Sequence, residues 1–316
     1  MTGRWGGGRY RSIHDLANLF LAWREFRRGK RQKPDVQAFE FDLEDNLFEL
    51  HEQLVSKTYS HQPYESFFVT DPKLRHIHKA TVRDRVLHQA VFHVLYPIFD
   101  HTFIYDSYSC RIGKGTHIAV NRLKEFCRKA SCNNSRNIFA LKCDIRKFFD
   151  SVDHEILIDL IKQSVVDPDV LWLIKLILDS FPKGLPLGNV TSQLFANIYL
   201  NELDQFAKHT LKAKYYLRYC DDFVLLNPDQ STLLVIRNFL ENNLKLQLHP
   251  NKIILRTYRQ GIDFLGYVVR PYCRTLRTKT KKRIFKNISE KNLASYLGVL
   301  DHCDGYAIRQ KLFDLV

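Results

Sequence analysis

The sequence predicts an α+β fold whose central sheet follows the order β-α-β-β-α-β once extra helices are set aside. Three observations support this prediction. From residue 137 onward, short apolar runs typical of strands are interspersed with segments of helical periodicity. Two of the strands flank an acidic pair, Asp221 and Asp222, and a third aspartate, Asp144, ends another strand. Because this topology places the end of the first strand beside the central hairpin, we expect the three aspartates to lie close together.

The first part of the chain is predicted to be mainly helical. Residues 2–11 are rich in Gly and Arg and indicate a flexible arm. Ser12 precedes Asp15 by three positions, which is typical of a helix N-terminus. The expected elements are helices at 12–28, 42–56, 82–96 and 116–129, and strands at 66–70 and 74–79 joined by a turn at 71–73.

The rest of the chain contains the predicted sheet. Its expected strands are residues 138–144, 215–220, 222–227 and 252–257. Its expected helices are residues 153–165, 170–181, 191–209 and 231–243. This order gives a split βαβ sheet covered by helices on one face. Residues 270–316 are basic and become helical in their later part.

The acidic pair indicates a metal site. At the tip of a hairpin both carboxylates can face the same space, and like charges in apolar surroundings are costly unless a cation binds them. An Asp-Asp pair alone is also typical of a solvated turn. The third carboxylate, Asp144, favours the metal interpretation, since clustered hard oxygen ligands suit Mg²⁺. Two such ions can activate a 3′-hydroxyl and stabilise a leaving pyrophosphate.

The composition indicates a folded protein with a polyanionic partner. The chain has 316 residues with 45% apolar content, which is enough for two or three lobes. Its 48 Lys and Arg against 34 Asp and Glu give a net charge of +14. This favours nucleic acid as a partner, with a merely well-solvated basic surface as the alternative.

Seven cysteines without a Cys-x-x-Cys pair, and no apparent secretory leader, predict reduced thiols and a cytoplasmic location. The most apolar run, residues 170–178, is too short to span a membrane.

Five motifs, in order across residues 71–267, resemble the palm of reverse transcriptases. They are Asp144 to Phe149, Leu185 to Gln193, Tyr219 to Asp222, His249 to Lys252, and Phe264 to Tyr267. The resemblance implies a right-hand polymerase with fingers, a ferredoxin-like palm and a short helical thumb. It divides the chain into an N-terminal helical extension (1–60), fingers with interleaved palm helices (61–136), palm (137–268) and thumb (269–316).

The same resemblance implies roles for the first and third motifs. Asp144 and Asp221 would bridge two Mg²⁺ ions, with Mn²⁺ as an alternative ion, and Asp222 would be a weaker ligand or an electrostatic support. The backbone carbonyl of Ile145 would add a ligand. Phe149 aligns with the aromatic steric gate that excludes a 2′-hydroxyl. The alternative is that Phe149 and its neighbour Phe148 are core aromatics.

Further residues align with substrate-binding positions of the family. Those expected to contact the incoming nucleotide, besides Ile145 and Phe149, are Arg75, Lys79, Leu187, Gly188, Gln193 and Lys252. Arg75 would bind the triphosphate through its planar fork, and Lys252 would meet the pyrophosphate. Those expected to contact template or primer are Arg111, Lys114 and Gly266. Solvated surface charges remain the alternative for Lys79.

Two residues that differ from the usual sequence of the second motif indicate a subtype of reverse transcriptase. Most reverse transcriptases carry Gln before the glycine of the second motif and Pro after its serine, where this chain has Leu187 and Gln193. These residues, and the segment 103–117, are similar to reverse transcriptases of diversity-generating retroelements. That resemblance implies error-prone cDNA synthesis from a template RNA using dNTPs, mutagenic retrohoming, and a small basic helical accessory protein as partner. Leu187 also removes a hydrogen bond to the nucleotide, which predicts lower fidelity unless this side chain only packs against the palm.

Two other interpretations stay open. One is a reverse transcriptase of another prokaryotic lineage, such as a group II intron maturase, a retron or a defence enzyme. The end of the chain at Val316 leaves little room for a maturase domain. The other is a non-catalytic RNA-binding scaffold, which the retention of three acidic residues disfavours.

Overall fold

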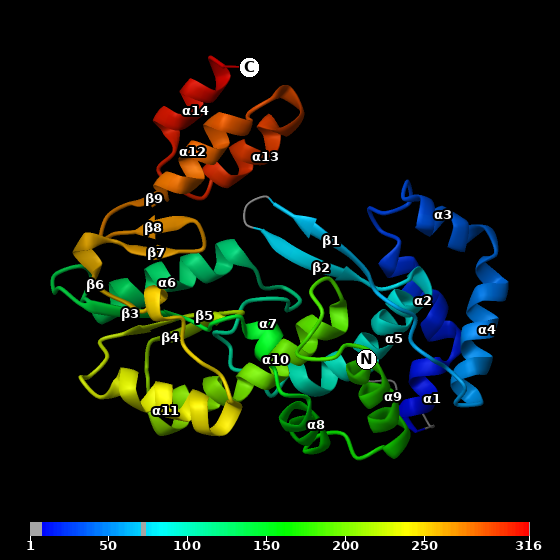
Figure 1. Cartoon of the computed structure of the whole chain (residues 1–316). Helices are drawn as coiled ribbons and strands as arrows, with labels where there is room; N and C mark the ends of the chain where they lie inside the picture. The colour runs from blue at the N-terminus through cyan, green and yellow to red at the C-terminus, as the bar shows by residue number, and fades with distance from the viewer. Residues whose placement is uncertain (1–7, 71–73, 316) are drawn as a thin grey trace. The chain divides into compact units, whose positions relative to one another are not determined.

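The computed structural model describes residues 8–70 and 74–315. Residues 2–7 of the predicted arm and the predicted turn at 71–73 lie outside this range. The chain divides into two compact units. Unit 1 comprises residues 1–104, 147–202 and 240–246, and unit 2 comprises residues 105–146, 203–239 and 247–316. Figure 1 shows the elements of both units coloured along the chain. The four regions expected from the sequence remain a prediction.

Unit 1 contains a helical bundle in which α5 packs against α1, α2 and α3. The predicted helix at 12–28 is two helices, because Asp15 interrupts it and its side chain accepts a hydrogen bond from the Ala17 amide at the start of α2. Ser12 is therefore not the cap. The helices are α1 (Arg9–His14), α2 (Leu16–Phe26), α3 (Pro34–Phe41), α4 (Leu43–Val55), α5 (Val82–Asp100), α7 (Phe148–Ser151), α8 (His154–Lys162), α9 (Pro168–Asp179) and most of α10 (Val190–Gln205).

Unit 1 also contains the predicted antiparallel hairpin. Strand β1 (Glu65–Val69) pairs with β2 (Arg75–Lys79), with Phe67 opposite Ile77. Every residue of β1 is exposed, and β2 becomes partly buried toward Lys79. The hairpin is therefore anchored at one end only.

Unit 2 is built on the predicted four-stranded sheet. Its strands are β3 (Phe139–Asp144), β4 (Tyr216–Tyr219), β5 (Asp222–Leu226) and β6 (Ile254–Thr257). Their spatial order is β4-β5-β3-β6 and every pairing is antiparallel. Successive residues of β5 from Phe223 onward are all buried, so both faces of the sheet are covered at its centre. The split βαβ strand order is confirmed, whereas the cover is not confined to one face of the sheet.

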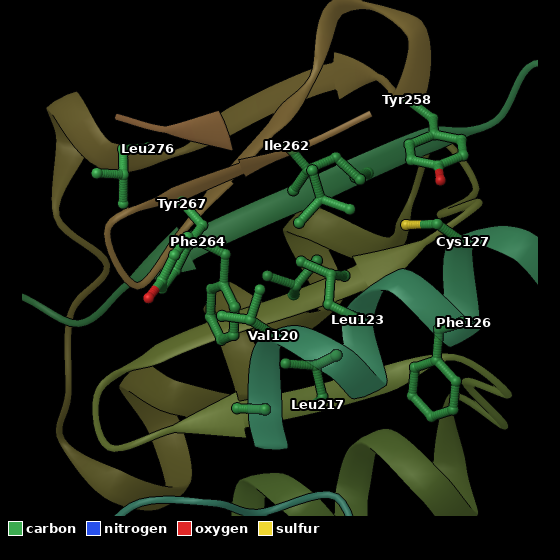
Figure 2. Close-up of a cluster of buried hydrophobic side chains, with 14 of the residues drawn as sticks. Val120, Leu123, Phe126, Cys127, Leu217, Tyr258, Ile262, Phe264, Tyr267 and Leu276 are labelled. Atoms are coloured by element: carbon green, nitrogen blue, oxygen red, sulfur yellow. The ribbon is translucent and has the colours of Figure 1, made fainter. Parts of the chain in front are cut away.

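One face of this sheet packs against α6 (Thr116–Ala130). Figure 2 shows Val120, Leu123 and Phe126 of this amphipathic helix in a buried cluster with Leu217 of β4 and with Ile262 and Phe264. The last two belong to a second, three-stranded sheet that the sequence did not predict, formed by β7 (Ile262–Phe264), β8 (Tyr267–Val269) and β9 (Arg274–Leu276). This apolar cluster holds the sheet that carries the aspartates.

The remaining elements of unit 2 are mainly helical. They are α11 (Thr232–Leu244, continuing into unit 1), α12 (Thr278–Asn287), α13 (Glu290–Leu300), α14 (Tyr306–Phe313), a π-helical turn (Phe206–Thr210) and two 3-10 turns (Pro250–Lys252 and Tyr258–Gln260). Helix α12 is strongly basic, as expected for residues beyond 270. Within residues 8–70 and 74–315, none of the helices combines the length and the apolar character that crossing a bilayer requires.

Candidate active site

The three aspartates meet at one end of the four-stranded sheet. Asp144 ends β3 and is the direct ladder partner of Asp222, which begins β5. The amide of Ile145 donates a hydrogen bond to the carbonyl of Asp221 over 3.1 Å. Cys220 and Asp221 form the two-residue connection between β4 and β5, with Cys220 in the left-handed region at φ 54°. The predicted proximity of the three residues is therefore confirmed by strand register and a backbone hydrogen bond.

The local electrostatics resist full ionisation of the acidic pair. Burial raises the pKa of Asp221, and the nearby charges of Asp144 and Asp222 raise it further. Burial also raises the pKa of Asp222, against the opposing influence of Lys142. The Oδ1 atom of Asp222 is buried and has no hydrogen-bond partner among the described residues. A cation at this end of the sheet would relieve both effects.

Two lysines contact the carboxylates. Lys252 Nζ lies 2.6 Å from Asp144 Oδ1, and Lys142 Nζ lies 3.2 Å from Asp222 Oδ2. Lys142 precedes Asp144 by two residues on β3, so both side chains leave the same face of the strand. Sequence reasoning missed Lys142, although its spacing from Asp144 was a usable signal. The predicted Lys252 is at the site.

The donor chemistry of this site suits a divalent cation. Three carboxylates with an unpartnered buried oxygen offer the hard ligands that Mg²⁺ and Mn²⁺ prefer. No group of three or more His, Cys, Asp or Glu side chains is arranged as a ready metal cage in the described part of the chain. The carboxylates of Asp144 and Asp222 each contact a lysine ammonium group instead.

A second group of predicted residues gathers within unit 1 around Phe149. Phe148 is buried against Tyr199 while Phe149 is only partly buried, so the core role falls to Phe148. The Phe149 carbonyl accepts a hydrogen bond of 2.7 Å from the Leu185 amide. Gly184 has φ 71°, and a Cβ at this position would lie 2.2 Å from the Phe149 carbonyl oxygen. Only glycine permits this close approach.

The loop that follows Gly184 lies on strand β2. The carbonyl of Leu187 accepts a hydrogen bond of 3.1 Å from the His78 amide. Gly188 has φ 122°, and a Cβ there would lie 3.3 Å from Ile77 Cγ2. Unit 1 thus joins Phe149 and Leu187 through one loop and docks that loop on the strand that begins at Arg75.

The other predicted nucleotide contacts differ in their surroundings. Arg75 is exposed at the start of β2, and Gln193 is exposed on α10. Lys79 Nζ lies 2.9 Å from Asp35 and 3.2 Å from Glu65, and the hydrogen bond to Asp35 is the main reason that its pKa is raised. Lys79 is therefore ion-paired with the protein itself.

The predicted template and primer contacts lie in unit 2. Arg111 donates to the Ser107 carbonyl over 3.2 Å. Lys114 donates to the Tyr105 carbonyl over 2.7 Å, and its Nζ lies 3.4 Å from the centre of the Tyr105 ring. Gly266 forms the β7–β8 turn, in which it and Leu265 both have positive φ angles of 89° and 49°. Two positive φ angles are the signature of a type I′ hairpin turn.

The chain belongs to the reverse transcriptase (RNA-dependent DNA polymerase) family, whose model matches residues 70–269. It is thus a member of a family of polymerase enzymes. The chain is 26% identical over 266 residues to protein YkfC of Escherichia coli (strain K12), covering 69% of this chain and 69% of that protein.

Its other relatives include proteins of introns. The chain is 24% identical over 350 residues to the group II intron-encoded protein LtrA of Lactococcus lactis subsp. cremoris, covering 86% of this chain and 56% of that protein. It is 20% identical over 258 residues to the putative COX1/OXI3 intron 2 protein of Saccharomyces cerevisiae, covering 60% of this chain and 29% of that protein. The match thus spans little more than half of LtrA and less than a third of the intron 2 protein.

Solved structures show the same architecture. Telomerase from Candida albicans matches with a TM-score of 0.52 and 13% identity, covering 79% of this chain and 54% of that one. Telomerase from Candida tropicalis matches with a TM-score of 0.50 and 12% identity, covering 72% and 59%. The mixed helix and sheet architecture accordingly agrees with a right-hand polymerase fold.

Proposed function

We propose that this chain synthesises DNA on an RNA template by two-metal phosphoryl transfer from dNTPs. The observation that carries the proposal is the ladder pairing of Asp144 with Asp222, together with the hydrogen bond between Ile145 and Asp221. These contacts bring Asp144, at the end of β3, next to the turn and strand start that carry Asp221 and Asp222. Membership of the reverse transcriptase family supplies the reaction class.

The residues present fit a pair of Mg²⁺ ions, with Mn²⁺ as the alternative. Asp144 and Asp221 would hold both ions, the Ile145 carbonyl would add a ligand, and Asp222 would act as a weaker ligand or support. When bound, such ions activate a 3′-hydroxyl and stabilise the charge of a leaving pyrophosphate. Lys252, which contacts Asp144, would place a cation beside the reacting phosphates.

The nucleotide would be held by the loop that joins Phe149 and Leu187 and by strand β2. Phe149 serves as the steric gate, since its partly exposed ring is anchored through its own carbonyl. Gly188 permits close approach of the backbone, Arg75 and Lys79 bind phosphate oxygens, and Gln193 lies on the following helix. For Lys79 this requires release from Asp35 or Glu65.

Template and primer would be bound mainly through phosphates. Arg111 and Lys114 lie beside glycines, and Gly266 occupies a tight turn of the second sheet. The basic helix α12 suits the same polyanion, as does the net charge of +14. We assign residues 61–136 to fingers, 137–268 to palm and 269–316 to thumb, after an N-terminal extension at 1–60.

We further propose that synthesis is error-prone and serves retroelement-driven diversification. Leu187 carries this part of the proposal, since an aliphatic side chain cannot donate the hydrogen bond that would fix the incoming nucleotide. The partners would be a template RNA, the cDNA primer and product, and a small basic helical accessory protein. A group II intron-type enzyme is the second candidate, because the relatives of this chain include the group II intron-encoded protein LtrA.

Primer extension on an RNA template tests the reaction. The purified chain with dNTPs and Mg²⁺ should extend a DNA primer, and Asp221→Asn should abolish extension because it removes a charged metal ligand. Asp229→Asn is the matched control, as Asp229 is an exposed aspartate that caps the start of α11. Normal extension by Asp221→Asn would contradict the metal assignment. Sequencing of the cDNA separates the two candidates, since only the diversifying enzyme should concentrate errors at one template base.

A further inference from the structure

A fully buried ion pair lies beneath the acidic turn of unit 2. The side chains of Arg218 on β4 and Asp204 near the end of α10 are 1% and 0% exposed. The guanidinium donates twice to the carboxylate, from Nε to Oδ1 over 2.7 Å and from Nη2 to Oδ2 over 2.6 Å. The Tyr216 hydroxyl donates a third hydrogen bond to Asp204 over 2.6 Å. Both oxygens of the Asp204 carboxylate thus accept hydrogen bonds.

Such a pair is a poor source of stability. Removing two charges from water is expensive, and a well-packed apolar pair of similar size often stabilises a core equally well or better. The sheet around Arg218 is otherwise apolar, with Leu217 and Phe223 buried on it. A guanidinium at this position therefore calls for a role beyond packing.

The third nitrogen of the guanidinium indicates that role. Nη1 of Arg218 donates to the carbonyl oxygen of Cys220 over 3.1 Å. Cys220 has φ 54°, a left-handed conformation that is unfavourable for a side chain with a Cβ. Because its carbonyl belongs to the peptide that joins Cys220 to Asp221, the hydrogen bond fixes the orientation of that peptide.

The acidic turn is held from the opposite side as well. The Asp221 carbonyl accepts the hydrogen bond from Ile145, so Asp221 is flanked by two anchored peptides. Arg218 is itself fixed, since its amide donates to the Asp106 carbonyl over 2.9 Å and its own carbonyl accepts from the Tyr108 amide over 3.0 Å. The backbone of Arg218 is thus held in place by two hydrogen bonds.

We propose that Arg218, oriented by Asp204, is a positioning residue for the reaction. Its Nη1 holds the strained Cys220–Asp221 peptide so that the Asp221 carboxylate faces Asp144. Arg218 touches neither substrate nor reacting atoms, and it acts only through the backbone of Cys220. This inference rests on the proposed polymerase function and adds to it the residues that prepare the acidic turn.

The test compares three variants of the full chain. Arg218→Lys keeps a cation beside Asp204 but loses the planar fork, so it cannot serve the carboxylate and the Cys220 carbonyl together. Asp204→Leu combined with Arg218→Met replaces the pair by apolar side chains, which preserves the core if the lysine variant fails to fold. Tyr258→Phe is the control, because it removes a buried tyrosine hydroxyl of the same unit that has no hydrogen-bond partner among the described residues.

Two readouts are needed. In primer extension, Arg218→Lys and the double variant should lower kcat by about tenfold or more, while KM for dNTP changes by less than about twofold. Titration of Mn²⁺ followed by electron paramagnetic resonance should show weaker binding in both variants. Tyr258→Phe should match the unmodified chain in kcat and in Mn²⁺ affinity, whatever its melting temperature.

The outcomes separate this inference from the proposed function. An unmodified chain that neither extends primers nor binds Mn²⁺ would overturn the proposed function and this inference with it. An active unmodified chain whose Arg218→Lys or double variant keeps normal kcat and Mn²⁺ affinity would overturn the positioning role alone. A kcat loss in Tyr258→Phe equal to that of the other variants would show that any disturbance of the buried core lowers kcat, and it would overturn the positioning role.

Discussion

Acidification should destabilise unit 1 through a buried histidine. His88 lies on α5, is fully buried, and has no hydrogen-bond partner for either ring nitrogen among the described residues. Its ring centre lies 5.3 Å from that of His61, with Asp84 and Arg85 as further charged neighbours. Burial is the main cause that lowers the pKa of His88 to about 3.

The sign and size of the effect follow from linkage. A group whose pKa is lowered in the folded state is protonated at a higher pH in the unfolded chain than in the folded one. The free energy of unfolding therefore falls as the pH drops below the pKa of the unfolded chain, which is near 6.5. Lowering the pH from about 7.5 to about 5.5 should therefore cost about 1.4 kcal/mol from His88 alone. Burial lowers the pKa of His61 too, so this residue adds to the loss in the same direction.

Urea denaturation at the two pH values measures this loss. His88→Leu is the informative variant, because it keeps a similar volume and removes the titrating ring. Its free energy of unfolding should change less between the two pH values than that of the unmodified chain, by about 1.4 kcal/mol. Equal pH dependence in the two proteins would refute the reasoning, since His88 would then carry no part of the proton uptake.

Three further predictions concern the loop around Phe149. Leu187→Gln should lower the misincorporation frequency, by about tenfold if the restored hydrogen bond is worth about 1.4 kcal/mol, and an unchanged error spectrum in sequenced cDNA would remove the fidelity argument. Phe149→Ala should allow incorporation of ribonucleotides in a gel-based extension assay, whereas continued exclusion would assign the gate to another residue. Gly184→Ala should lower the melting temperature more than Gly29→Ala. The two glycines have similar φ angles of 71° and 70°, but of these two only Gly184 has no room for a Cβ. Equal losses of melting temperature would mean that the close approach to Phe149 can relax.

The sheet could be predicted because its sequence signals are local and repeated. Apolar strands, helical spacing and a hairpin with an acidic tip each follow from a few neighbouring residues, and together they allow few topologies. The second sheet was missed because its three strands have three residues each, too few to show a period. The break at Asp15 was missed because one capping side chain interrupts an otherwise continuous helical pattern.

The charge partners at the site could not be predicted in the same way. Asp144 and Asp222 were expected to be near each other because topology relates strand ends, and their register confirms this. Which lysine contacts which carboxylate depends on side-chain direction and on residues as far apart as Asp144 and Lys252. Asp204 gave no signal, since an aspartate on a helix is ordinary until its partner is known.

The acidic turn illustrates how such a site can be prepared before any substrate arrives. Its backbone is fixed by the Ile145 amide and by Arg218, whereas the carboxylates of Asp222 and of the neighbouring Asp144 contact flexible lysine side chains. Loading of divalent ions would then require Lys142 and Lys252 to move and would leave the peptides in place. Because preorganised ligands avoid a reorganisation cost at the moment of reaction, a backbone of this kind favours catalysis. The backbone of the acidic turn is therefore rigid because buried hydrogen bonds hold it. The cations around the carboxylates can exchange.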